Sequence, residues 1–174
     1  MDLNKFKSLV FNRNNLITFL VLILISWQQL PILYNNFKAR GVILEKKIYV
    51  PIYHPAKMES VLFPPENKRA LTIFWATWCA PCKLEMNRLK SSVENGHIKS
   101  DQIFAINPFE DSNVVRAFLL KKPFPFIFIE DLGLSNILNI KATPTTLFID
   151  KGAVDSSSSG MSLIGIWRAE NYLN

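Results

Sequence analysis

The chain starts with one long uncharged, apolar segment and then changes to short apolar runs separated by polar ones. No charged residue occurs between positions 14 and 37. Within this range the nineteen residues of Leu16–Tyr34 are apolar enough, and long enough, to cross a hydrocarbon core of about 30 Å. We therefore expect a transmembrane anchor at 16–34, preceded by a basic N-terminal segment at 1–15.

Two alternatives for this segment are a cleaved signal peptide and a buried helix of the soluble domain. Gln28, Gln29 and Pro31 interrupt the segment and leave an unbroken apolar run of only Leu16–Trp27, the length of a signal-peptide core. No small-x-small cleavage site follows it, which favours a retained anchor. Three basic residues precede the segment and four follow it closely, so the positive-inside count does not decide its orientation.

Strand and helix patterns alternate along residues 59–174, after a mixed stretch at 35–58 that we interpret as a stalk with a short extended piece near Ile48–Tyr53. The expected strands are 71–75, 102–106, 126–129, 145–149 and 153–158. The expected helices are 81–94, 111–121, 134–138 and one after Ser162. This last helix should have an apolar face made of Leu163, Ile166, Trp167 and Leu173. The alternation predicts an α/β domain with a central mixed β-sheet flanked by helices.

The net charge of +6 is concentrated around the apolar segment. Residues 1–60 contain eight Lys or Arg against three acidic residues, whereas the other 114 residues contain twelve against eleven. A protein that binds nucleic acid by displacing counterions clusters its basic charge on the folded domain. The observed distribution fits a membrane surface instead, so we expect lipid contact through Leu16–Tyr34 and no nucleic-acid partner.

The only two cysteines, Cys79 and Cys82, lie three residues apart. A disulfide that closes so short a loop stabilises a fold by only about 2 kcal/mol in the chain-entropy model, so reactivity explains the pair better than stability does. The predicted helix places Cys79 in its first turn, which Pro81 suits and where free N–H groups stabilise a thiolate. Cys82 lies one turn deeper. We therefore assign Cys79 as the nucleophile and Cys82 as the resolving thiol.

Two motifs resemble those of the thioredoxin superfamily. Residues 74–82, Phe-Trp-Ala-Thr-Trp-Cys-Ala-Pro-Cys, resemble its active-site signature, and residues 142–146, Ala-Thr-Pro-Thr-Thr, resemble its second hallmark. The resemblance covers roughly residues 60–174 and implies a thioredoxin fold. It also implies that a cis peptide bond precedes Pro144, that Pro144 faces the two cysteines, and that the neighbouring backbone at Thr143 pairs with an extended substrate chain. Substrate contacts are then expected at Trp78, Ala80 and Pro81.

The anchor and the sequence Cys82-Lys83-Leu84-Glu85 resemble the TlpA-like, ResA-like and ScsD-like membrane-tethered proteins of this superfamily. The resemblance implies that Glu85 fills the place of their active-site acid. Three residues after Cys82 and on the same helical face, a carboxylate there could take or return a proton during exchange. Cytoplasmic thioredoxins carry an aspartate in the preceding strand, where this chain has Ile73. Asn87 departs from the proline that usually kinks the helix of TlpA-like proteins.

Other uses of the cysteine pair fit the sequence less well. A zinc site needs two further ligands, and the only histidines, His54 and His97, are far apart. Covalent haem attachment requires a histidine directly after Cys82, where Lys83 stands. A copper chaperone would use a wider cysteine spacing together with a histidine. We expect no metal and no cofactor.

The sequence therefore predicts a thiol–disulfide oxidoreductase that is tethered to the bacterial inner membrane, with its catalytic domain on the periplasmic side. Its expected partners are extracytoplasmic proteins that contain cysteines, and a membrane electron-transfer protein. The resemblance to TlpA-like proteins favours a reductant, for example in cytochrome c maturation. Alternatives are a disulfide oxidant or isomerase of ScsD-like type, and a tethered module that binds a peptide or metal without turnover.

Overall fold

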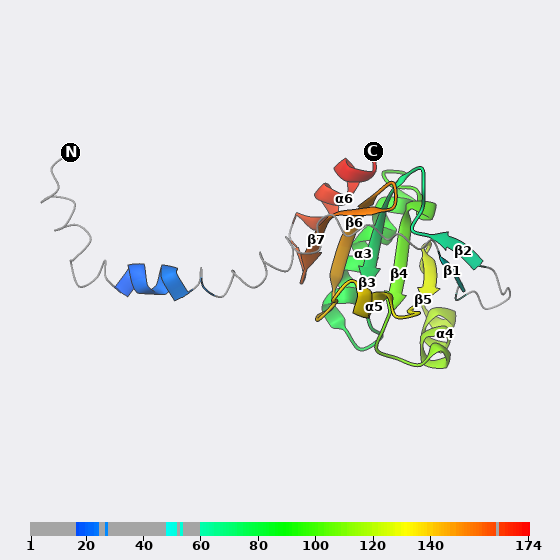
Figure 1. Ribbon diagram of the computed structural model, residues 1–174, viewed down its shortest axis with the longest axis horizontal. Helices are drawn as coiled ribbons and strands as arrows, with labels where there is room; N and C mark the ends of the chain where they lie inside the picture. Colours follow the sequence, from blue (N-terminus) through cyan, green and yellow to red (C-terminus); the bar gives the residue numbers. More distant parts are fainter. Residues whose placement is uncertain (1–16, 25–26, 28–47, 52, 54–59, 163) are drawn as a thin grey trace, which may run out of the picture. The chain divides into compact units, whose positions relative to one another are not determined.

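The computed structural model describes residues 17–24, 27, 48–51, 53, 60–162 and 164–174. The chain divides into two units, Met1–Phe37 and Lys38–Asn174. In the first unit, residues 17–24 are helical (Figure 1). Much of the predicted anchor Leu16–Tyr34 lies outside the described residues, and no described helix is long and apolar enough to cross a membrane. The anchor therefore stays a prediction.

The second unit is built on a five-stranded sheet, the predicted central mixed sheet. Its strands are β3 (Arg69–Phe74), β4 (Ile103–Asn107), β5 (Ile127–Glu130), β6 (Thr145–Asp150) and β7 (Ala153–Ser159). They lie in the order β5-β4-β3-β6-β7. Strands β3, β4 and β5 are parallel, whereas β6 runs antiparallel to both of its neighbours. The carboxyl ends of β3 and β4 and the start of β6 therefore meet at one end of the sheet.

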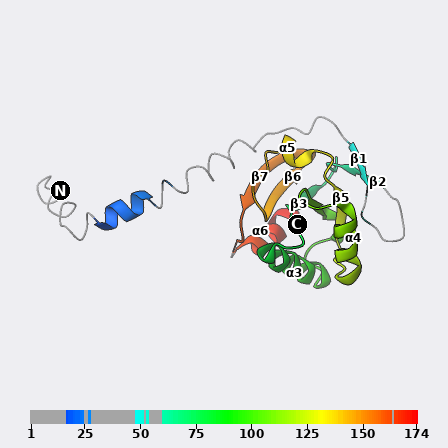
Figure 2. The same cartoon turned by 90° about the horizontal axis from the view of Figure 1, so that it is seen from below.

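Helices cover both faces of this sheet. The helices are α3 (Ala80–Glu94), α4 (Ser112–Lys121), α5 (Leu134–Ile137) and α6 (Gly165–Leu173), with the short 3-10 helix η1 at Ser100–Gln102. Figure 2 shows α3 and α6 on the face opposite to α5. In β3, Leu71 and Ile73 join the apolar cluster of α3, α4 and α6, while Ala70 and Phe74 join the cluster that contains α5. Burial on both faces explains the almost continuous apolar sequence of β3.

A second, two-stranded sheet packs at the β5 side of the domain. It consists of β1 (Ile48–Pro51) paired antiparallel with β2 (Ser60–Phe63), and the sequence predicted only the first of these strands. The backbone N–H of Tyr53 donates to the carbonyl of Phe128 in β5 over 3.0 Å. Phe63 is fully buried, with its ring centroid 5.2 Å from that of Phe104 in β4. These contacts join the small sheet to the core.

The expected apolar face of the last helix is wrong in one position. Trp167 is 66% exposed, whereas Ala169 and Leu173 are buried. Residues four apart share a helix face, so Ala169 and Leu173 define the buried side and Trp167 points away from it. Leu163 lies outside the described residues. The helix expected at 111–121 begins at Ser112, because Asp111 is its N-cap: the Asp111 side chain accepts a hydrogen bond from the N–H of Asn113 over 2.8 Å.

Candidate active site

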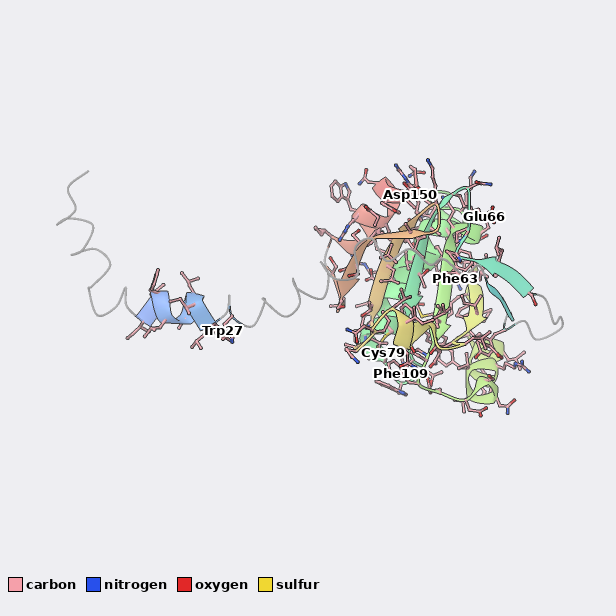
Figure 3. The ribbon with its side chains drawn as sticks, viewed as in Figure 1. Trp27, Phe63, Glu66, Cys79, Phe109 and Asp150 are labelled. Carbon is pink, nitrogen blue, oxygen red and sulfur yellow. A yellow bond between two sulfur atoms is a disulfide. The ribbon has the colours of Figure 1, made fainter. Side chains whose placement is uncertain are left out.

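The turn that joins β3 to α3 carries the two cysteines. Cys79 is the N-cap residue of α3, its own N–H donates to the carbonyl of Ala76 over 3.1 Å, and its carbonyl accepts from the N–H of Lys83 over 3.2 Å. Pro81 occupies the first turn of the helix, where its missing N–H costs no hydrogen bond. Figure 3 shows Cys79 at the end of the domain opposite to Asp150. The local sequence therefore holds Cys79 at a helix N-terminus.

Cys79 and Cys82 form a disulfide bond. The backbone N–H of Cys82 lies 3.2 Å from Sγ of Cys79 and donates to it. Cys79 is 4% exposed and Cys82 is not exposed at all. In the dithiol form, the same N–H and the positive end of the α3 dipole would stabilise a thiolate on Cys79. An outside sulfur can reach Cys79 more easily than the fully buried Cys82.

Pro144 lies at the same end of the sheet as the cysteines. The Thr143–Pro144 peptide bond is cis, as the resemblance implies. Thr145, the first residue of β6, is the register partner of Phe74 at the end of β3. The carbonyl of Pro144 accepts a hydrogen bond from the N–H of Gly160 over 2.7 Å, which ties the loop to the end of β7. The two motifs, about sixty residues apart in sequence, are thus adjacent in the sheet.

Exposed aromatic rings flank the disulfide. Trp78 is 66% exposed and Phe109 is 48% exposed, and their ring centroids are 6.2 Å apart. We call this pair the aromatic rim; Figure 3 shows Phe109 at the same end of the domain as Cys79. Trp75, by contrast, is fully buried in the core. Apolar surface beside a reactive group is typical of a site that contacts another molecule.

A carboxylate from the next loop holds the turn before Cys79. Glu110 accepts hydrogen bonds from the N–H of Thr77 over 2.6 Å, from the hydroxyl of Thr77, and from Nδ2 of Asn107 over 2.7 Å. Burial disfavours the charged form, but these hydrogen bonds outweigh it and hold the pKa of Glu110 below its ordinary value. Glu110 therefore links the end of β4 to the active-site turn.

Replacing Glu110 with glutamine should destabilise the fold by about 1 kcal/mol at neutral pH, because hydrogen bonds to a partly exposed charged acceptor weaken. The folded pKa is lowered, so this stabilisation is present above the unfolded pKa of about 4.3 and is lost as the pH falls through the folded value. Urea unfolding of both proteins at neutral and acid pH measures the difference. Glu94→Gln, at a 60% exposed side chain, is the control and should change little. If the difference in the free energy of unfolding between the wild type and Glu110→Gln is as large at acid pH as at neutral pH, this role for the carboxylate is contradicted.

Glu85 lies on the buried face of α3, one turn after Cys82. Only 7% of the residue is exposed, and its Oε2 accepts no hydrogen bond from the described residues, although Nη1 of Arg88 lies 3.5 Å away. Burial raises the pKa of Glu85 above its ordinary value, and the nearby Arg88 charge opposes this only in part. Helix α3 continues through Asn87 without a break. A carboxyl group with a raised pKa on the same helix face as a redox-active cysteine is suited to proton transfer.

Four further residues of the site carry no prediction from the sequence: Thr77, Asn107, Phe109 and Glu110. A signal for them exists, because Asn107 ends a buried strand that is parallel to β3, and residues beyond the carboxyl ends of parallel strands gather at one edge. Among the described residues, no group of three or more His, Cys, Asp or Glu side chains could hold a metal ion. His97 instead contacts Glu170, with Nδ1 3.2 Å from Oε1.

A disulfide between cysteines three residues apart at a helix start, beside a cis proline on a mixed sheet, defines the thiol–disulfide oxidoreductases of thioredoxin fold. The chain belongs to the AhpC/TSA family, whose sequence pattern matches residues 57–156. The predicted family, α/β fold and enzyme class are thereby confirmed.

Individual relatives agree with this class. The chain is similar to the thiol:disulfide interchange protein DsbE of Pseudomonas fluorescens, with 33% identity over 152 residues that cover 75% of this chain and 83% of the relative. It is also similar to the thiol-disulfide oxidoreductase ResA of Oceanobacillus iheyensis, with 30% identity over 112 residues, 63% of this chain and 57% of the relative. The crystal structure of StoA from Bacillus subtilis has the same fold, with a TM-score of 0.63 and 18% identity over 76% of this chain and 99% of that one.

Proposed function

We propose that the protein is a membrane-tethered reductant of disulfides in extracytoplasmic proteins and that Cys79 and Cys82 are its catalytic residues. The observation that carries the proposal is the Cys79–Cys82 disulfide at the N-terminus of α3, with one sulfur accepting a backbone hydrogen bond and the other fully buried. This unequal environment supports the unequal roles that exchange requires.

The reaction begins with the dithiol form of the protein. The Cys79 thiolate attacks one sulfur of the substrate disulfide, and the other substrate sulfur leaves as a thiolate and takes a proton from solvent. Cys82 then loses its proton and attacks Sγ of Cys79, which releases the second substrate sulfur and forms the Cys79–Cys82 disulfide. Two electrons pass from the protein to the substrate. A membrane electron-transfer partner must return two electrons before the next cycle.

Glu85 is the proposed acceptor of the Cys82 proton. It lies on the same buried face of α3 as Cys82, and its burial favours the protonated form that proton acceptance produces. Ile73 is apolar, so β3 supplies no carboxylate at the position where cytoplasmic thioredoxins have one.

The aromatic rim and the Pro144 loop form the proposed contact surface for the substrate. Trp78, Ala80 and Pro81 are exposed around the disulfide, and Thr143 is half-buried next to Pro144. An extended substrate chain that brings its own disulfide to Cys79 would lie against these residues. The aromatic rings would supply contact area at low entropic cost. Cysteine-containing extracytoplasmic proteins are the proposed substrates.

The periplasmic side of the bacterial inner membrane is the proposed location. The support is the uncharged segment at 16–34 in the sequence, flanked by basic residues. Residues 17–24 within this segment are helical and their side chains are exposed, which suits a lipid environment.

The reduction potential tests the direction of electron flow. The full chain is equilibrated in glutathione buffers of graded redox poise, and its thiols are counted after alkylation. We expect a potential of about −270 mV, close to that of thioredoxin. A value above about −180 mV, in the range of isomerases and oxidants, would overturn the reductant assignment while leaving exchange chemistry in place.

A further inference from the structure

A small cavity lies between α3, α6 and the sheet, beside Glu85. Its volume of about 20 Å³ is enough for one water molecule. The apolar part of its lining comes from Leu71, Leu89, Phe148 and Ala169, all of which are buried. Three hydroxyl-bearing residues, Thr146, Ser158 and Ser162, also line it. Of these lining residues, Gly160 is exposed and Ser162 is half-buried, so this side of the cavity is the one nearest to solvent.

Glu85 lines this cavity, and its Oε2 accepts no hydrogen bond from the described residues. Buried polar atoms in proteins are almost always hydrogen-bonded, either to protein groups or to ordered water. The charged groups that face Glu85 are Arg88 from α3, at 3.5 Å, and Arg168 from α6, which lines the same cavity. Strands β3, β6 and β7 contribute only uncharged residues to the lining. A water in the cavity could donate a hydrogen bond to the Glu85 carboxylate.

Gly165 borders the Glu85 carboxylate directly. A Cβ atom added at Gly165 would lie only 2.7 Å from Oε1 of Glu85. The backbone of Gly165 is not among those with positive φ, so its conformation does not demand a glycine. Because Gly165 has no side chain, the Glu85 carboxylate can occupy the space next to it. The nearest atom is the far end of a flexible side chain, so an alanine here should displace the carboxylate first; Cβ of Ser162, at 3.1 Å, would also have to give way slightly.

We propose that this cavity is the proton exit of the active site: one water in it hydrogen-bonds the Glu85 carboxylate and passes the proton to solvent past Ser158 and Ser162. Gly165 is the positioning residue that keeps the carboxylate at the cavity. The inference rests on the proposed function, because the proton that leaves is the one that Glu85 takes from Cys82. The electron pair left on the Cys82 sulfur forms the bond to Cys79, and the pair of the broken bond leaves on the substrate sulfur.

The decay of a mixed disulfide between Cys79 and glutathione measures one step alone: Cys82 loses its proton and attacks Sγ of Cys79. The reduced full chain is mixed with oxidised glutathione, and the adduct is followed by acid quench over a range of pH. We expect the wild-type decay rate to rise with pH as Glu85 loses its proton. Glu85→Gln should remove this rise and slow decay about a hundredfold at neutral pH.

Two variants test the route: Gly165→Ala displaces the carboxylate from the cavity, and Ser158→Val replaces a hydroxyl in its lining with a larger apolar side chain. Gly165→Ala and Ser158→Val should each slow the decay of the adduct about tenfold. Each should also move the increase of the decay rate to higher pH, because the Glu85 carboxyl group is harder to ionise without its water. Neither should have a further effect in the Glu85→Gln background. Asn171→Ala, at an exposed residue of α6 outside the cavity, is the matched control and should leave the rate and its pH dependence unchanged.

The inference is overturned if both variants leave the decay rate of the adduct unchanged. It is also overturned if they slow the decay as much in the Glu85→Gln background as in the wild-type background. Either result would leave the proposed function intact, because formation of the adduct depends on Cys79 and not on the cavity. The proposed function itself fails if no adduct forms on Cys79.

Discussion

Replacing Cys82 with serine will leave the protein joined to its substrate in a stable mixed disulfide. The variant keeps Cys79 at the N-terminus of α3, so the first attack still occurs. It lacks the buried sulfur that must attack Sγ of Cys79 to release the substrate, and a serine hydroxyl cannot replace that sulfur. Non-reducing gels and mass spectrometry of the full chain, after mixing with a disulfide-containing protein, measure the adduct.

The reciprocal variant is the matched control for this trapping experiment. Cys79→Ser keeps Cys82, which has no exposed surface in the structure, and should form almost no adduct. Equal trapping by both variants would mean that either cysteine can attack a substrate. That result would contradict the separate roles assigned to the two sulfurs.

Replacing Trp75 with alanine will destabilise the fold by about 3–5 kcal/mol, as expected for truncation of a buried tryptophan. Trp75 is not exposed at all, and its ring centroid lies 5.4 Å from that of Phe118 and 5.8 Å from that of Phe128. Such a loss is a large part of the total stability of an ordinary domain, which is about 5–15 kcal/mol. Urea unfolding, followed by circular dichroism, measures it.

Trp78, three residues further on, provides a matched control with the opposite expected behaviour. Its ring is 66% exposed, so Trp78→Ala should change the stability by no more than about 0.5 kcal/mol. It should slow exchange with a protein substrate about tenfold, as the loss of an interface tryptophan commonly does, and leave exchange with glutathione unchanged. If Trp78→Ala unfolds the protein, the ring has a structural role instead. If exchange with protein substrates does not slow, the aromatic rim is not part of the substrate contact.

The elements closest to the chemistry were the ones that local sequence signals specified best. Strand β3 is an apolar run that is buried on both faces. Helix α3 begins with Pro81 in its first turn, and Asp111 caps α4, so each of these elements has a local cause in the sequence. The sequence alone placed Cys79, Cys82 and Pro144 near one another only through a family resemblance. The register between Thr145 and Phe74 supplies the physical reason, and register depends on pairing between distant segments.

Features that depend on contacts between distant segments were missed. Strand β2 is four residues long, and its buried end, Phe63, packs against Phe104 forty-one positions further on. The hydrogen bonds of Glu110 to Thr77 cross 33 positions. Neither residue belongs to a periodic pattern that would have marked it. In the sequence, nothing distinguishes Gly165 from any residue near the start of a helix. Its lack of a side chain is explained only by the structure, in which the Glu85 carboxylate lies next to it.

The rate of disulfide reduction by the wild-type chain and by Cys79→Ser, measured side by side in the same buffer, tests the central claim most directly. Both proteins are first reduced and freed of reductant, and then mixed with the same protein disulfide. We expect the wild-type chain to reduce the substrate while its own Cys79–Cys82 disulfide forms, and Cys79→Ser to show only the rate of a mixture without the protein. A variant that reduces the substrate as fast as the wild type would contradict the assignment of Cys79 as the reactive sulfur.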